Sequence, residues 1–193
     1  MINDINMKHD ITYKKIIGII NNLYEATGAM HYFEKPLIGI ASAADPLFQQ
    51  FKTIIGNFHW TPDEALKHEF PEHTARSVIA WILPINEKAR IENSRMTDGP
   101  SHEWARVRSF GELANEQMRL QVVSMLTHYG YPSVVPQLLQ RKMGYKFREL
   151  EYASYWSERH AAFAAGLGTF GLSSGLITEK GVAMRVGTVV TTL

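Results

Sequence analysis

The stretch Tyr152–Leu193 reads YASYWSERHAAFAAGLGTFGLSSGLITEKGVAMRVGTVVTTL and decides the fold expected for this chain. Its first part predicts a helix, because aromatic residues recur near helical spacing and the alanines favour helix. Glycines then end that helix and keep the next segment thin enough for close backbone approach. Leu176–Thr178 is expected as a short strand, and Val182–Leu193 predicts a longer strand after a glycine turn, because it is rich in β-branched residues.

The segment Gly166–Gly171 matches the spelling of the dinucleotide-binding fingerprint, GxGxxG. That fingerprint requires a strand before it and a helix after it. Here a helix is expected before the glycines and a strand after them, so we reject a nicotinamide-binding loop. The plain alternative is a glycine-capped helix that leads into a strand.

The order of short motifs in this stretch resembles a known family. Glu158-Arg159, then Ala165–Gly168, then Gly171, Leu176-Ile177 and a glycine turn resemble the cobalamin-binding domain of epoxyqueuosine reductases. The ending Arg185–Leu193 is more similar to the related reductive dehalogenases. The resemblance implies an α/β domain in which helices flank a mixed central sheet, with a nitroreductase-like fold.

The resemblance also implies a set of site residues. The corrinoid would lie against the glycine-rich stretch, and the implied cofactor-binding residues are Gly166, Leu167, Gly168, Gly171, Ser173 and Ser174. Glu158 and Arg159 are the implied orienting pair. Leu172 stands where the family usually carries a lysine.

Tyr152 is the implied proton donor. It falls where epoxyqueuosine reductases carry an acidic residue, and reductive dehalogenases use a tyrosine as the donor. A phenol with an unperturbed pKa of about 10 is protonated at neutral pH and can supply a proton to a reduced substrate. The alternative is an aromatic core residue on an amphipathic helix.

Length and composition favour one ordinary globular unit. The 193 residues, with 45% hydrophobic and 20% charged residues, suit a single domain over residues 1–193. The net charge of +1 gives no broad attraction to nucleic acid, and the chain has no cysteine with which to bind an iron–sulfur cluster. No apolar run is long enough to span a membrane, and the polar first ten residues lack a signal-peptide core, so a cytoplasmic location is expected.

The rest of the chain alternates helices with short strands. Helices are expected over Ile11–Ala29, Pro46–Ile55, a short segment after Thr61, and Ser101–Tyr129. Strands are expected over Leu37–Ala41, Arg76–Pro84 and Tyr131–Val135. The apolar run in Arg76–Pro84 indicates a central strand covered on both faces. The long helix is expected to bury a stripe of Phe110, Leu113, Ala114, Met118, Val122, Met125, Leu126 and Tyr129.

Two further segments are expected to lack regular structure. Asn86–Pro100 is polar and rich in turn residues, which predicts a surface loop. Gln137–Leu150 is expected as a connection whose basic residues are solvated. His68 and His73 lack the spacing of a zinc site, and no metal ligands are assigned.

The resulting hypothesis is a cobalamin-dependent reductase domain, with an iron–sulfur cluster only where the full gene carries a downstream cysteine domain. A small molecule or a modified nucleoside is the expected substrate, tRNA is a weaker candidate partner, and a homodimer is a further alternative. Two other functions stay open: a corrinoid carrier without turnover, and a flavin-binding relative of the nitroreductases.

Overall fold

The computed structural model describes residues 13–142 and 153–193. Its main sheet has four strands in the order β1-β2-β6-β3. The strands are β1 (Leu37–Ser42), β2 (Ser77–Pro84), β3 (Ser133–Val134) and β6 (Met184–Thr191). The expected α/β class, with a central sheet flanked by helices, is confirmed; each pairing in the sheet is antiparallel, where a mixed sheet was expected.

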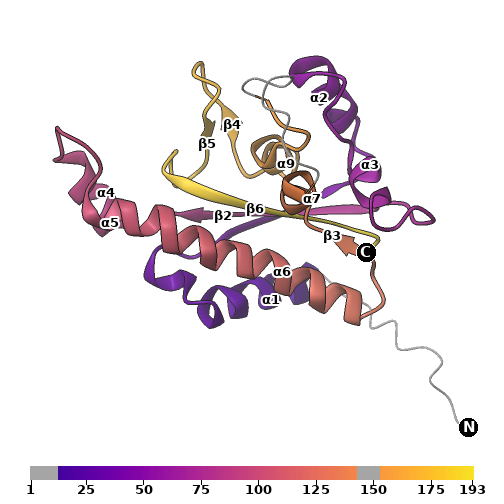
Figure 1. Cartoon of the computed structure of the whole chain (residues 1–193), viewed down its shortest axis with the longest axis horizontal. Helices are drawn as coiled ribbons and strands as arrows, with labels where there is room; N and C mark the ends of the chain where they lie inside the picture. The colour runs from indigo at the N-terminus through magenta and orange to yellow at the C-terminus, as the bar shows by residue number, and fades with distance from the viewer. Residues whose placement is uncertain (1–12, 143–152) are drawn as a thin grey trace, which may run out of the picture.

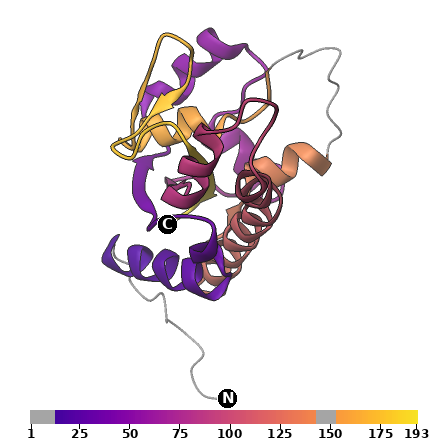
Figure 2. The same cartoon turned by 90° about the vertical axis from the view of Figure 1, so that its left-hand side faces the viewer.

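Helices cover both faces of this sheet (Figure 1). Helices α1 (Tyr13–Ala26) and α6 (Glu112–His128) lie on one face. The other face carries α2 (Pro46–Ile55), α3 (Pro62–Lys67), α7 (Pro136–Lys142) and α9 (Glu158–Ala164), with a hairpin of β4 (Thr169–Phe170) and β5 (Leu176–Ile177) beside them. Figure 2 shows the two helical layers end-on, with the sheet between them.

The apolar side chains of strand β2 point to both faces of the sheet, which explains why helices pack on both faces. Side chains alternate between the two faces of a strand. Ile79, Trp81 and Leu83 enter the core beneath α1 and α6, whereas Val78 and its alternating neighbours enter the cores on the opposite face. Because both faces are buried, the strand is apolar throughout, as its sequence predicted. Gly187 lies opposite Trp81 in the register, where an added Cβ would stand 2.2 Å from the indole ring.

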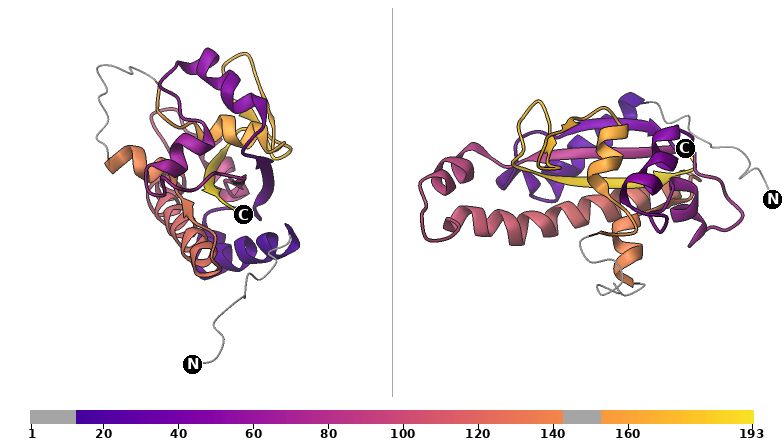
Figure 3. Two further views of the ribbon diagram at one scale, coloured as in Figure 1. Left: turned by 90° about the vertical axis from the view of Figure 1, so that its right-hand side faces the viewer. Right: turned by 90° about the horizontal axis from the view of Figure 1, so that it is seen from above.

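The long helix predicted from Ser101 is one helical run with an irregular centre. It begins as α5 (His102–Arg106), passes through a π-helical turn at Val107–Gly111 and continues as α6. The right panel of Figure 3 shows this run lying along the strands of the sheet. Among the described residues, no helix is long and apolar enough to span a bilayer.

The predicted core stripe of this helix is wrong at two positions. Ala114, Met118, Val122 and Leu126 are buried, but Leu113 and Phe110 are 60% and 53% exposed. Leu113 lies about 100° from Ala114 around the helix, on the side away from the sheet. The polar residues Asn115 and Arg119 occupy the buried side instead.

Several element boundaries also differ from the sequence predictions. Glu87–Ser94 forms helix α4, capped by Asn86, within the segment expected to be a loop. Helix α7 occupies the start of the expected connection after Val135. Residues 153–157 are not helical, and α9 begins only at Glu158, because the backbone N–H of Trp156 and Ser157 bind side chains of Gln140 and His59.

Candidate functional site

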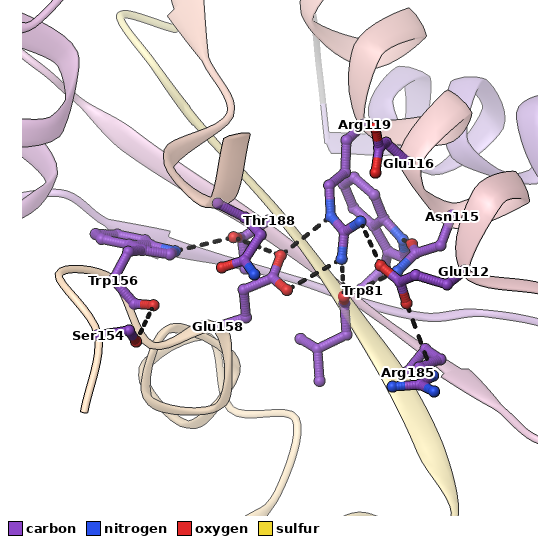
Figure 4. Close-up of polar contacts among 12 residues, drawn as sticks. Trp81, Glu112, Asn115, Glu116, Arg119, Ser154, Trp156, Glu158, Arg185 and Thr188 are labelled. Atoms are coloured by element: carbon purple, nitrogen blue, oxygen red, sulfur yellow. Dashed lines mark hydrogen bonds and ion pairs between the residues drawn. The ribbon is translucent and has the colours of Figure 1, made fainter. Parts of the chain in front are cut away.

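A buried arginine organises the space between α6, β6 and α9. Arg119 is 1% exposed, although arginine is rarely buried unless it is paired. Its Nε and Nη2 donate to the two carboxylate oxygens of Glu158 at 3.1 and 3.0 Å, and its Nη1 donates to Glu112 at 2.9 Å. Nη2 also donates to the Val186 carbonyl at 2.6 Å. Figure 4 shows the guanidinium between the two glutamates, so this cation joins a helix on each side of the sheet through β6.

Further hydrogen bonds hold this pair in place. The Thr188 hydroxyl donates to Glu158 at 3.2 Å and accepts from the Trp156 indole at 3.0 Å. On the other side, Asn115 accepts from the Trp81 indole at 2.9 Å and donates to the Val186 carbonyl at 3.0 Å. Two buried indoles therefore fix the polar residues on either side of Arg119 (Figure 4). Each of these hydrogen bonds restricts the orientation of the side chains that it joins.

Two opposing effects act on the pKa of Glu158, and burial is the larger of them. Burial raises the pKa of the Glu158 carboxyl, and the charge and hydrogen bonds of Arg119 oppose that rise. Glu112 is less buried and lies 3.7 Å from Arg185 Nε. Two arginines and two glutamates thus alternate along the floor of the site, and removal of any one charge unbalances the others.

Above this network lies an open cleft of about 710 Å³. Its charged lining residues are Arg108, Glu112, Arg119, Arg141, Glu158, Arg159 and Arg185. Five arginines against two glutamates give the lining an excess of positive charge. Three serines and Gln137 add hydrogen-bonding groups, and Leu176, Val182, Met184 and Val186 supply apolar surface. The cleft therefore suits a large ligand that combines an apolar face with polar or anionic substituents.

The structure places Glu158 and Arg159 in different roles. Glu158 bonds to Arg119, whereas Arg159 Nη1 donates to the Ser174 carbonyl at 2.6 Å. Ser174 has φ of 58°, in the left-handed region that non-glycine residues rarely adopt. Arg159 thus holds the β4–β5 turn against α9. Both Glu158 and Arg159 line the cleft, and Arg159 also lines a second pocket beside it.

The predicted cofactor-binding residues do not all meet at one cavity. Gly166, Leu167 and Gly168 line a separate hollow of about 460 Å³ together with Pro36–Ile38. The close approach expected at these glycines is found at Gly168, where an added Cβ would stand 2.5 Å from the Ile177 carbonyl oxygen of the same hairpin. The backbone of Gly168 does not adopt a left-handed φ. Gly171 and the exposed Ser173 belong to the hairpin. Gly175 and Leu176, on the same hairpin, line the charged cleft.

Tyr152, the predicted proton donor, lies outside the described residues. Its neighbours Ser154 and Ser157 line the cleft. Among the residues that the structure does describe, no group of three histidine, aspartate or glutamate side chains could hold a metal ion.

Sequence reasoning missed Arg119, Glu112 and the role of His59. A detectable signal existed for the first two: Glu112, Asn115 and Arg119 follow the helical spacing i, i+3, i+7 beside the apolar stripe. His59 carried no such signal. It is 1% exposed, its Nε2 accepts from the Ser157 N–H at 3.1 Å, and burial, with His160 nearby, lowers its pKa to about 4.

Comparisons with known proteins give structural neighbours only. No protein-family model matches the chain, and no curated protein matches it. Three solved structures of epoxyqueuosine reductase match it with TM-scores of 0.45, 0.44 and 0.43 and identities of 17%, 17% and 16%. The second is from Bacillus subtilis, and the third contains a modified tRNA-Tyr stem loop. Each match covers 92% of this chain and 46% of the other, so the chain spans about half their length. At these values the likeness assigns neither function nor ligand.

Proposed function

We propose that this chain is the cobalamin-binding domain of a reductase that resembles epoxyqueuosine reductases and reductive dehalogenases. The supporting observation is the cleft of about 710 Å³ beside the Gly175 end of the hairpin, with the Arg119–Glu158 pair in its floor. The Glu158-Arg159 motif and the glycine hairpin, which carry the sequence resemblance, both contribute to its wall.

The types of side chain that line the cleft match the chemical groups of a corrinoid. A corrinoid presents a broad apolar ring whose edge bears amide arms and a phosphate. Val182, Met184 and Leu176 offer apolar surface for the ring, while Ser154 and Arg185 offer hydrogen-bond donors for the arms and the phosphate. The amides of Leu167–Ser174 were predicted to contact the corrinoid, whereas the hairpin residues that line this cleft are Gly175 and Leu176. Bound cobalamin would supply the electrons of the reduction at its metal centre.

This chain's own residues would then orient the substrate and move the proton. Arg119 holds Glu158 in place through two hydrogen bonds, so these two side chains set the shape of the floor. Tyr152 is proposed to donate the proton, because its phenol is protonated at neutral pH. A small molecule or a modified nucleoside is the proposed substrate class, with tRNA as a weaker candidate. A single domain over residues 1–193 and a cytoplasmic location remain predictions.

The cofactor assignment is tested by absorption spectroscopy. The purified chain is incubated separately with hydroxocobalamin and with flavin mononucleotide, and unbound cofactor is removed by gel filtration. We expect cobalamin, and not flavin, to co-elute with the protein near one equivalent. Flavin retention without cobalamin would establish the nitroreductase-like alternative. Cobalamin retention without turnover under a strong chemical reductant would favour the corrinoid carrier.

The proton donor is tested by Tyr152→Phe, which removes only the phenolic hydroxyl. Cobalamin binding should be unchanged, and reductive turnover of epoxide or halogenated substrates should fall by about 100-fold or more, the usual scale for a positioned acid. Turnover that survives the substitution would exclude Tyr152 as the donor while leaving the cofactor assignment intact.

A further inference from the structure

A second pocket lies between α2, α9 and the hairpin. Its volume is about 660 Å³, which is in the size range of small-molecule sites. Unlike the charged cleft, it is lined mainly by apolar and aromatic side chains, among them Phe51, Ile54, Phe163 and Phe170. Ser154 and Arg159 line both this pocket and the charged cleft, and Ser174 lies here as well, but the rings themselves have no part in the proposed cofactor site.

The rings surround a neutral imidazole. His160 lies 4.9 Å from Phe51 and 4.6 Å from Phe170, measured between ring centroids, and Phe163 lies 5.5 Å from Phe170. Burial, followed by the charge of Arg159, lowers the pKa of His160 to about 4. At neutral pH the aromatic rings of the pocket are therefore uncharged, while the Arg159 guanidinium, which bonds to the Ser174 carbonyl, is a cationic group in the lining.

The two nitrogens of that imidazole differ in their partners among the described residues. Nδ1 of His160 lies 2.7 Å from the Ser157 hydroxyl, which fixes the orientation of the ring. No hydrogen bond to Nε2 is found among residues 13–142 and 153–193. Gln50 and Ser154 also line the pocket. The chemistry is thus a wall of aromatic rings with few, fixed hydrogen-bonding groups.

We infer that this pocket binds a planar aromatic molecule of about two fused rings that carries one hydrogen-bonding substituent. Aromatic rings pack against Phe163 and Phe170 in offset or edge-to-face geometry, which a saturated molecule of the same size does not reproduce. His160 Nε2 then bonds to the substituent and sets the orientation of the ligand. This inference does not rest on cobalamin binding in the charged cleft.

The test compares 2-naphthol with its saturated analogue decahydro-2-naphthol, by titration of the full chain and observation of backbone amide chemical shifts. We expect saturable shifts at Phe51, Phe163 and Phe170, and a Kd for 2-naphthol roughly 3- to 10-fold below that of the saturated alcohol, the scale of an aromatic pair. Phe170→Leu keeps an apolar side chain without the ring and should remove that preference. Phe110→Leu is the matched control, because Phe110 is exposed on the helix across the sheet.

Two further variants complete the test. His160→Phe keeps a ring but removes the nitrogen, and it should weaken both alcohols by roughly 10-fold, because both carry the hydroxyl that would bond to Nε2. Phe163→Leu repeats the ring test in case Phe170→Leu does not fold. Equal affinity for the two alcohols, shifts centred outside the pocket, or no saturable binding would each overturn the inference.

Discussion

Arg119 provides the most direct test of how the site is held together. Arg119→Met keeps much of the side-chain length but leaves Glu158 buried without its cation. Arg119 donates two hydrogen bonds to Glu158 and one to Glu112, and its side chain is 2% exposed. Breaking a buried ion pair from one side costs about 3–5 kcal/mol. We therefore expect the free energy of unfolding to fall by that amount, measured by urea denaturation at pH 7.

The same helical run offers a matched control. Arg106 forms an ion pair with Glu103 at 3.2 Å, but its side chain is 46% exposed. Arg106→Met should cost less than about 1 kcal/mol, because exposed pairs contribute little. Adding Glu158→Gln to Arg119→Met removes the unpaired charge and should recover part of the loss. Equal costs for the two arginine variants, or simple additivity in the double variant, would refute the reasoning.

The Arg119→Met variant should also respond to pH in a defined direction. Without Arg119, the main opposition to the burial that raises the pKa of Glu158 is gone, and the Thr188 hydrogen bond opposes it only weakly. A carboxyl with a raised folded pKa supports stability at low pH and loses that support as pH rises through the raised value. The stability difference between wild type and Arg119→Met should therefore shrink between pH 7 and pH 5. A difference that grows on acidification would contradict this account.

Three more predictions concern the fold and its titration. Leu113→Ala should change the free energy of unfolding by no more than about 0.5 kcal/mol, whereas Met118→Ala on the buried face should cost about 2–5 kcal/mol by denaturant titration. Gly187→Ala places a Cβ against an indole 2.2 Å away and should lower stability by at least ~1–3 kcal/mol; an unchanged Tm would show that the strand can shift freely. His59 and His160 each have a pKa lowered to about 4 in the folded protein, below the value of about 6.5 expected in the unfolded chain. Their contribution to stability is therefore fully present above about pH 6.5, and the free energy of unfolding should decrease as the pH falls from there toward 4. Replacing both histidines with glutamine should flatten that slope in urea titrations at stepped pH.

Local sequence patterns predicted the frame of the molecule well. The unbroken apolar run of β2 indicated a strand buried on both faces, and Val78 and Ile79 do lie on opposite faces. A helix was likewise predicted at α1, where Ile16 and Ile20, four residues apart and so on one helical face, both lie in the core. These features follow from short-range periodicity, which a sequence displays directly.

The candidate site depends on long-range contacts that periodicity does not encode. Arg119 meets Glu158 across 39 residues and the Val186 carbonyl across 67. The aromatic spacing near Trp156 predicted a helix there, but tertiary hydrogen bonds to its backbone prevailed over local preference. The sequence motif paired Glu158 with the adjacent Arg159, whereas in the structure the cation beside Glu158 comes from α6.

The central claim, that the charged cleft binds cobalamin, is tested by the Kd of hydroxocobalamin in wild type and in two arginine variants. Arg185 lines the cleft, whereas Arg76 is exposed beside Ser77, at the opposite end of β6 in the sheet register. Loss of one charge-assisted hydrogen bond weakens binding by roughly 10-fold or more. We predict saturable binding by wild type, a Kd about 10-fold higher for Arg185→Gln, and no change for Arg76→Gln. Absence of saturable binding, or equal affinities in all three proteins, would contradict the claim.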